Sequence, residues 1–213
     1  VYRDLRQPIG TLGDASRTQE VIERYASMVE MEMEPFHYGS HYSSAGVVLY
    51  YLIRLEPFTS FAILLQGGKF DHADRMFDSI AQTWTGCMKS TSDVKEMIPE
   101  FYYLPEALVN NNAVPLGATQ GGRQLDDVVL PPWAEDSPVR FVQIMREALE
   151  SDYVSATLDE WVDLVFGYKQ RGLAAEEAVN VFHPLTYEGN VDFEKLTDEV
   201  ERRSVISQID NFG

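Results

Sequence analysis

Hydrophobic positions recur with a helical period in several parts of the chain, separated by glycine, proline and polar residues. Val21, Tyr25 and Met28 lie on one helical face and predict a helix over 17–31. Residues 45–53, "AGVVLYYLI", are apolar on every side, which predicts a helix that runs through about Arg54 and is buried at the centre of the domain. Similar patterns predict helices over 61–66, 73–85, 138–149, 152–167 and 173–181, and from Thr197 or Asp198 into the tail.

Helix-capping residues stand where several of these patterns begin. Asp14 or Ser16 is suited to cap the first helix, and Pro35 stops the chain from continuing it. Ser137, followed by Pro138, is a strong start signal for the helix over 138–149. These signals support a mainly α fold.

The stretch over 86–112 has a different pattern. It contains many apolar side chains but neither a helical nor an alternating period, and Pro99 and Pro105 interrupt it. We expect irregular backbone that is nevertheless buried, followed by a small hairpin that turns at 120–122. The predicted fold is therefore mainly α, with irregular extended core segments flanked by helices and one small hairpin.

The charge balance narrows the classes of partner. The 213 residues include 34 acidic and 17 basic side chains, a formal net charge of −17 at pH 7. Nucleic-acid recognition needs a basic surface that neutralises phosphates, so we expect no nucleic-acid partner. The same deficit disfavours direct attachment to anionic lipids, and we expect any membrane association to be indirect.

The cysteine count and the apolar runs add two further limits. Cys87 is the single cysteine and can form no intramolecular disulfide, which favours a reducing compartment. The longest apolar runs, 45–53 and 61–65, are too short to cross a bilayer. The sequence does not begin with Met, and we expect it to be a piece of a longer polypeptide.

The stretch "PFHYGSHYSSAG", residues 35–46, is the first candidate for chemistry. His37 and His41 are four residues apart, a spacing with which two imidazoles on a helix can bind a metal. However, Gly39 lies between them, and the glutamate of the H-E-x-x-H motif is absent. We interpret these imidazoles as structural groups that hydrogen-bond to backbone, and expect no metal and no cofactor. The other residues assigned a structural role are Phe36, Tyr38, Tyr42, Trp133 and Trp161.

Four further residues are candidates because of their charge or reactivity. Cys87 falls in a predicted polar loop without the base and orienting group that a nucleophile needs. Arg54 ends an apolar helix beside Glu56, which predicts a buried or half-buried ion pair. Lys169 and Arg171, in "FGYKQRG", either complement the end of the preceding helix or contact a carboxylate or phosphate of a partner.

Several long strings together resemble the BEACH domain, named for the beige and Chediak–Higashi proteins and found also in neurobeachin. They include "FHYGSHYSSAGVVLYYLIRLEPFT", "DVKEMIPEFYYLPE", "LPPWAEDSP", "REALESDYVSATLDEWVDLVFGYKQRG" and "NVFHPLTYEG". The sequences "LQGGKFDHADRMF" and "AVNVFHPLTYEGNVD" are most similar to the branch that contains the autophagy-linked FYVE protein. Because BEACH domains carry further residues upstream, the resemblance implies one BEACH domain over 1–213 that lacks its N-terminal part.

The resemblance also implies a function. In this family the domain follows a PH-like domain, and a WD40 propeller usually comes after it, in very large cytoplasmic proteins. These proteins act as scaffolds in vesicle trafficking, the biogenesis of lysosome-related organelles and autophagy. We therefore expect a non-enzymatic protein–protein interaction module, peripheral to endosomal, lysosomal or autophagic membranes, with no catalytic residues.

The expected partner surface is apolar and aromatic and is built partly from "EFYYLPE". Its candidate residues are Glu100, Tyr102, Tyr103, Glu106, Lys169 and Arg171. Two alternatives remain open. One is a metal-dependent hydrolase with His37, His41 and His183 as ligands, and the other is direct phospholipid binding through the two basic residues.

Overall fold

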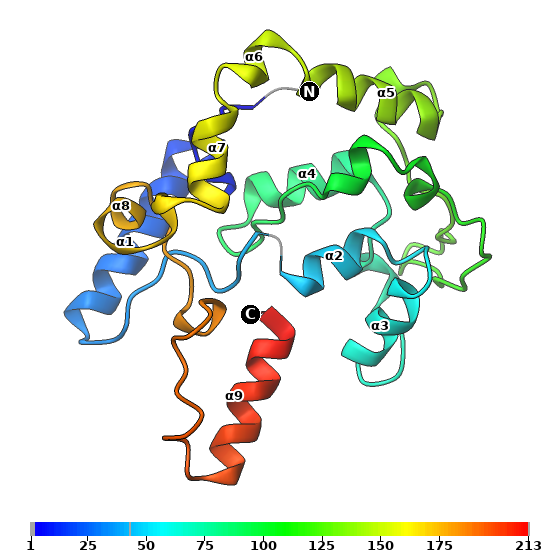
Figure 1. Cartoon of the computed structure of the whole chain (residues 1–213). Helices are drawn as coiled ribbons and strands as arrows, with labels where there is room; N and C mark the ends of the chain where they lie inside the picture. The colour runs from blue at the N-terminus through cyan, green and yellow to red at the C-terminus, as the bar shows by residue number, and fades with distance from the viewer. Residues whose placement is uncertain (1–2, 43, 213) are drawn as a thin grey trace. The chain divides into compact units, whose positions relative to one another are not determined.

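The computed structural model describes residues 3–42 and 44–212, and its regular structure there consists of helices and a few isolated β-bridges (Figure 1). The predicted mainly α fold is confirmed. The chain forms two compact units, which we name by their order along the sequence and not by their position in space. The central unit covers 46–86 and 97–152, and the flanking unit covers 3–42, 44–45, 87–96 and 153–212. Within the described ranges, no helix is both long enough and apolar enough to cross a membrane.

The flanking unit begins with the short 3₁₀ turn η1 (Ile9–Thr11) and helix α1 (Ala15–Glu30). The predicted cap is confirmed at Asp14, whose carboxylate accepts a hydrogen bond from the Ser16 N–H at 3.1 Å. Gly10 lies against the buried ring of Tyr38, and a Cβ atom at residue 10 would come within 2.2 Å of that ring. The chain therefore passes over Tyr38 at a point where a side chain would not fit.

The region predicted as one helix over 152–167 is divided into α6 (Asp152–Ser155) and α7 (Leu158–Val165), so that prediction was wrong. The hydroxyl of Thr157 donates to the Tyr153 carbonyl at 3.3 Å, and Thr157 has a non-helical φ of −135°. A threonine side chain that bonds to backbone in this way competes with the helical hydrogen bonds.

The rest of the flanking unit contains η6 (Tyr168–Gln170), α8 (Gly172–Glu177), η7 (Pro184–Thr186) and α9 (Glu199–Phe212). Helix α8 is shorter than the predicted 173–181, because Val179 adopts a left-handed φ of 54°. At the start of α9 the Asp198 carboxylate accepts a hydrogen bond from the Val200 N–H at 2.7 Å, which confirms one of the two predicted caps.

The core of the flanking unit is built around Phe182. Its ring packs against Tyr42 edge to face, with centroids 4.9 Å apart, and lies 5.7 Å from the ring of Tyr38. Val21 of α1 and Leu164 of α7 belong to the same buried cluster. The stretch over 35–46, which we call the histidine stretch, thus supplies part of the hydrophobic core.

The central unit contains α2 (Ala45–Tyr51), α3 (Phe58–Leu65) and α5 (Pro138–Leu149), and most of α4 (Ile80–Lys89). Its core holds an aromatic cluster in which the Tyr51 ring lies 5.0 Å from Phe77 and 4.9 Å from Phe101. Ser137 caps α5 by accepting a hydrogen bond from the Arg140 N–H at 3.2 Å, as predicted.

The helix predicted over 73–85 was wrong in its first half. After the 3₁₀ turn η2 (Ala73–Arg75) the backbone extends, and residue 79 forms a parallel bridge with Val129. Ser79 then starts α4, because its hydroxyl accepts a hydrogen bond from the Gln82 N–H at 3.3 Å. Trp84 was expected to face inward, but its side chain is 42% exposed.

The irregular buried section predicted over 86–112 is confirmed over 90–112, where the described backbone has only the 3₁₀ turns η3 (Pro99–Tyr102) and η4 (Pro105–Leu108). Residues 86–89 were wrongly included in it, because they belong to α4. Ile98, Phe101 and Leu108 are almost completely buried. The predicted hairpin is present in a minimal form, with one antiparallel bridge between Ala118 and Gln124.

Candidate functional site

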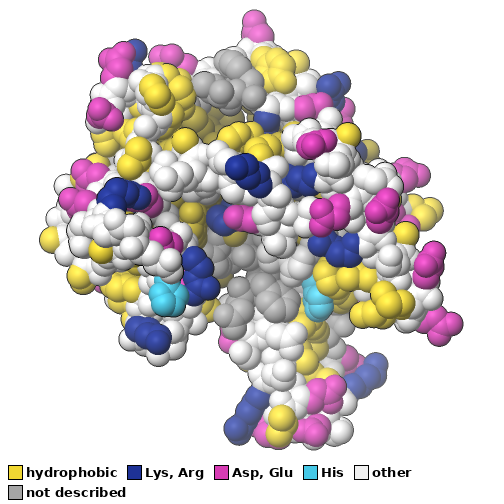
Figure 2. Space-filling model, turned by 180° about the vertical axis from the view of Figure 1, so that it is seen from behind, with side chains coloured by type: hydrophobic (Ala, Val, Ile, Leu, Met, Phe, Trp, Pro, Cys, Tyr) yellow, Lys and Arg dark blue, Asp and Glu magenta, His cyan; other side chains and the backbone are white. Residues whose placement is uncertain are grey.

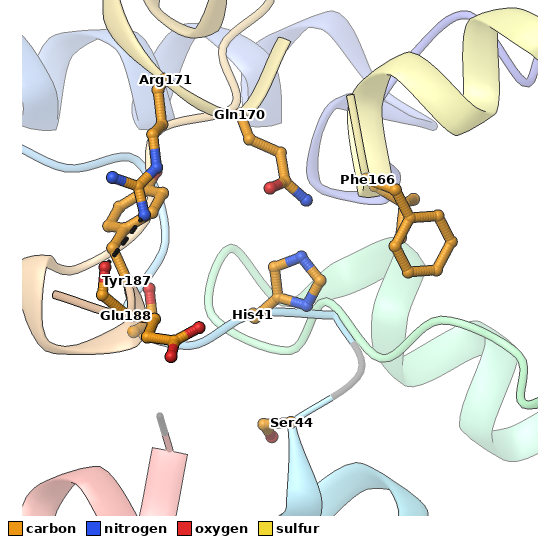
Figure 3. A pocket seen from close by; sticks show the side chains of 9 residues that line it. His41, Ser44, Phe166, Gln170, Arg171, Tyr187 and Glu188 are labelled. Carbon is orange, nitrogen blue, oxygen red and sulfur yellow. Dashed lines mark hydrogen bonds between the residues drawn. The ribbon is translucent and has the colours of Figure 1, made fainter. Parts of the chain in front are cut away.

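A pocket of about 360 Å³ lies within the flanking unit (Figure 3). Its walls come from the end of the histidine stretch, the residues after α7, the turn between η6 and α8, and the segment after η7. In Figure 3, Gln170 and Arg171 lie on one side of the hollow, and His41 and Glu188 lie on the other. The pocket therefore combines a guanidinium, a carboxylate, an amide and an imidazole.

Arg171 is the arginine among the residues that line this pocket, and two contacts orient it. Its guanidinium lies over the ring of Tyr187, 5.0 Å from the centroid. Its Nη2 atom donates a hydrogen bond to the Glu188 carbonyl at 3.3 Å. The planar guanidinium of arginine matches the geometry of a carboxylate or phosphate, so Arg171 is chemically suited to bind such a group.

Lys169 was grouped with Arg171 by sequence, but the two side chains have different partners. The Nζ atom of Lys169 forms an ion pair with Glu160 at 2.8 Å, and this hydrogen bond raises the pKa of Lys169. Lys169 also lies near the ring of Tyr168, 5.7 Å from its centroid, and it does not line the pocket. The predicted basic pair is therefore one anchored lysine and one arginine at a pocket.

His41 lies at the edge of the pocket and is tied into the core. Its ring lies 4.8 Å from Phe182 and 5.1 Å from Tyr42. Burial lowers the pKa of His41, and a hydrogen bond with the Val165 backbone opposes part of that shift. The neutral ring is thus favoured.

His37 is buried, with 3% of its surface exposed. Its Nδ1 atom accepts a hydrogen bond from the Val181 N–H at 3.0 Å, and its ring stacks on Tyr25 with centroids 4.3 Å apart. Burial, together with the nearby charge of Arg24, lowers the pKa of His37 to about 4. The Nδ1 atom of His183 accepts the Leu185 N–H at 3.2 Å.

All three histidines therefore have a hydrogen bond with the backbone. Phe36 contributes to the same packing, since its ring lies 4.9 Å from that of His183. Within residues 3–42 and 44–212, no three His, Cys, Asp or Glu side chains come close enough together to hold a metal ion.

Cys87 does not lie in a loop as predicted. It lies in α4, its side chain is 1% exposed, and burial with the nearby Asp93 raises its pKa to about 11. A thiol with this pKa stays protonated near neutral pH, and the thiolate is the reactive form.

Arg54 is fully buried, but it does not pair with Glu56 as predicted. Its Nε atom donates to the Asp126 carbonyl and its Nη1 atom donates to the Phe77 carbonyl, each at 2.7 Å. Glu56 instead accepts a hydrogen bond from the Ser60 hydroxyl at 3.0 Å, within the first turn of α3. Arg54 links separate backbone segments of the central unit because its fork can reach two carbonyls.

The two tryptophans assigned a structural role are partly buried. Trp133 stacks on Phe141 with centroids 5.3 Å apart, at the edge of the central core. The indole of Trp161 donates to the Glu96 carboxylate at 3.2 Å, and that carboxylate also pairs with Arg3.

The "EFYYLPE" segment of the central unit displays part of the expected aromatic surface. Tyr103 is 60% exposed, and its hydroxyl donates to the Glu100 carboxylate at 3.2 Å. Glu106 is exposed as well, whereas Tyr102 is half-buried and packs against the core. Tyr103 and Glu106 are thus the accessible members of this group.

Sequence reasoning did not identify Tyr187, Glu188 or Gln170 as neighbours of Arg171. Tyr187 comes 16 positions after Arg171 in the sequence. Between the two residues lies Val179, whose backbone has a left-handed φ of 54°. No motif in the sequence predicts that Tyr187 returns to Arg171.

A comparison with protein families decides the relationship that the sequence strings suggested. The model of the Beige/BEACH domain matches residues 1–213. This chain belongs to the BEACH domain family. It is 54% identical over 212 residues to "BEACH domain-containing protein B" of Arabidopsis thaliana and 50% identical over 216 residues to "Beige protein homolog 1" of Saccharomyces cerevisiae.

A third relative, "BEACH domain-containing protein lvsD" of Dictyostelium discoideum, is 54% identical over 213 residues. Each match covers 100% of this chain, but only 8%, 10% and 7% of the three relatives, in the order named. The BEACH domain thus corresponds to a small part of very long proteins, and none of these three carries the name of an enzyme. No relative named here carries the FYVE name either.

Proposed function

We propose that this BEACH domain is a non-enzymatic protein–protein interaction module of a large trafficking scaffold. The observation that carries the proposal is the oriented guanidinium of Arg171 at a pocket, with the exposed Tyr103 as a second contact residue. Arginine and tyrosine are enriched among the residues that dominate binding energy at protein interfaces. The small share of each relative that the chain covers supports a role within a larger polypeptide.

The proposed architecture places residues 1–213 as a BEACH domain between a PH-like domain and a WD40 propeller of the same polypeptide. The PH-like domain is the first proposed partner, and trafficking or autophagy proteins are further ones. The location that we propose is the cytoplasmic side of endosomal, lysosomal or autophagic membranes. Membership of the FYVE branch remains a prediction and supports none of these points.

The proposed role of the pocket in binding a partner is tested by reversing the charge of Arg171. In the Arg171→Glu variant, the affinity for the PH-like domain of the same polypeptide should fall about tenfold, because an acidic group of the partner loses the guanidinium and meets a repulsive carboxylate in its place. Isothermal titration calorimetry measures the affinity. Arg202→Glu, which makes the same change on the exposed side of α9, is the matched control and should bind normally. Equal binding by both variants would contradict a role for the pocket.

The proposed role of the exposed aromatic residue Tyr103 in binding a partner is tested separately with Tyr103→Ala. Phe61→Ala is the control, since Phe61 is 52% exposed on α3 of the same unit. We expect the Tyr103 variant alone to lose about tenfold in affinity, because a large aromatic contact is removed. If Tyr103→Ala and Phe61→Ala bind the PH-like domain as tightly as the unmodified chain, this segment is not the partner surface.

The alternative functions have weaker support. The ion pair with Glu160 engages Lys169, so direct lipid binding would rest on Arg171 alone within the predicted pair. The hydrolase alternative needs His37 and His183 as ligands, yet the Nδ1 lone pair of each accepts a backbone N–H. Salt-sensitive sedimentation with anionic vesicles, lost in Arg171→Glu, would favour the lipid alternative instead.

A further inference from the structure

The solvent-facing side of α1 and the residues that follow it carry hydrophobic side chains that the fold leaves uncovered. Val21, Tyr25 and Met28 face the protein, as the helical period requires. The side chains of Ile22, Val29, Met31 and Met33 are 40%, 53%, 61% and 53% exposed, respectively. We call these four residues the α1 apolar surface.

Acidic side chains alternate with this surface at the carboxyl end of α1. Glu30, Glu32 and Glu34 are all exposed, and the last turn of the helix contains no basic residue. Arg24 is a nearby cation, but its guanidinium donates to the backbone carbonyl of His37. Hydrophobic patches with acidic side chains beside them are also visible on the face of the molecule in Figure 2.

The position of these carboxylates on the helix strengthens their field. The carboxyl end of a helix carries a partial negative charge, so acidic residues there are unfavourable for the helix itself. The three carboxylates therefore create a negative potential at this end of α1, and the last turn of the helix contains no basic residue that would neutralise it. A positively charged partner would relieve that repulsion.

We infer that the α1 apolar surface and its three glutamates form a docking site for a basic amphipathic helix of another protein. The apolar side of such a helix would cover Val29, Met31 and Met33, and its lysines or arginines would face the carboxylates. Exposed methionines suit this role because their flexible side chains adapt to the surface that they contact. Charge complementarity favours a basic amphipathic helix over an amphipathic helix that has no basic residues.

This inference goes beyond the proposed function and uses different residues. The pocket involves Arg171 and the aromatic segment involves Tyr103, whereas the new site lies on α1 and the turn after it. Failure of the Arg171 and Tyr103 experiments would therefore leave this site unaffected.

The experiment uses a fluorescein-labelled synthetic amphipathic peptide of leucine and lysine, together with a scrambled peptide of the same composition. Fluorescence anisotropy with the whole chain should show about tenfold tighter binding of the amphipathic peptide, because only that peptide presents one continuous apolar face. The double variant Val29→Gln/Met33→Gln should weaken its binding about fivefold through lost apolar contact. The control Val139→Gln/Leu173→Gln changes two other exposed apolar residues and should have no effect.

A second pair of variants tests the charges. Glu30→Gln/Glu34→Gln should weaken binding about fivefold at low salt and less at high salt. The control Glu147→Gln/Glu150→Gln removes two exposed carboxylates near the end of α5. Circular dichroism confirms that each variant is folded.

Three outcomes would overturn the inference. Equal binding of the amphipathic and scrambled peptides, or no binding of either, would mean that α1 offers no such site. Equal losses in Glu30→Gln/Glu34→Gln and in its control Glu147→Gln/Glu150→Gln would show attraction by the net charge alone. A dimer of the chain that the Val29→Gln/Met33→Gln variant abolishes in light scattering would identify a second copy as the occupant.

Discussion

The imidazole of His37 shows how burial sets the chemistry of a single residue in this domain. Its ring is stacked on Tyr25, and its Nδ1 lone pair is engaged by the Val181 N–H. Protonation of Nδ1 would break that hydrogen bond and place a charge in a buried site near Arg24. His37 therefore serves the fold best as a neutral acceptor.

The lowered pKa of His37 makes stability depend on pH. The pKa falls from 6.5 to about 4 in the folded state, so the unfolded chain takes up the proton first as the pH decreases. The contribution of the neutral ring is complete above the unfolded pKa and is lost as the pH falls toward the folded one. Between about pH 7.5 and about pH 5.5, we expect a loss of about 1 kcal/mol in the free energy of unfolding.

Urea denaturation at these two pH values measures the effect. In His37→Gln, the amide oxygen replaces the Nδ1 acceptor without titrating, so this variant should lack that part of the pH dependence. His72→Gln is the control, because His72 is exposed and its replacement should leave the dependence unchanged. An identical pH dependence in His37→Gln and the unmodified chain would show that His37 is not the titrating group.

At the scale of elements, the end of α1 contains an unusual residue at a demanding position. Glu32 has a left-handed φ of 57°, its N–H bonds to the Val29 carbonyl at 3.1 Å, and the Met33 N–H bonds to the Met28 carbonyl at 2.9 Å. This is the Schellman pattern of helix ends, in which glycine is the usual left-handed residue. Replacing Glu32 by glycine should therefore raise the free energy of unfolding by about 0.5–1 kcal/mol.

Thermal and urea unfolding of Glu32→Gly test this expectation, with Glu32→Gln as the control. The glutamine variant removes the charge near the helix end but keeps a Cβ atom, so it should gain only about 0.3 kcal/mol. Equal gains in both variants would show that the charge, and not the backbone conformation, limits the stability of this helix end.

The elements that sequence predicted well are those whose signals are local. The caps at Asp14, Ser137 and Asp198 depend on one side chain and a nearby N–H, and all three were recognised. The break at Thr157 and the extended segment before Ser79 were missed, because they depend on a hydroxyl bond and on pairing with Val129. Helical periodicity does not register such competing interactions.

The prediction of the candidate site was limited in the same way, because it used local features of the sequence. From the sequence, Arg171 was identified as a cation that a partner could contact, and Lys169 was grouped with it. That grouping did not predict the neighbours of Arg171 in the structure. Lys169 is close in sequence and turns to Glu160, whereas Tyr187 and Glu188 reach Arg171 only because the chain returns after α8. Proximity that depends on tertiary structure was beyond the reach of the sequence pattern.

At the scale of the whole molecule, the dominant feature is the excess of acidic side chains, with a net charge of −17 at pH 7. Ion pairs on the surface offset little of this charge. The pairs Lys195–Asp192 and Arg203–Glu199 are highly exposed, and exposed pairs contribute only about 0–1 kcal/mol each. Repulsion between acidic groups should therefore destabilise the folded chain, because folding brings the charges closer together.

Added salt should consequently stabilise this domain. Screening shortens the range of repulsion to about 10 Å at 0.1 M ionic strength, so we expect the melting temperature to rise by about 3 °C between about 0.02 M and about 0.3 M sodium chloride. Differential scanning calorimetry measures the shift, and chloride is used because sulfate also strengthens hydrophobic burial. Glu30→Gln/Glu34→Gln, with two fewer charges, should show a smaller rise. A melting temperature that falls as chloride is added would mean that attraction within ion pairs outweighs the repulsion among the carboxylates.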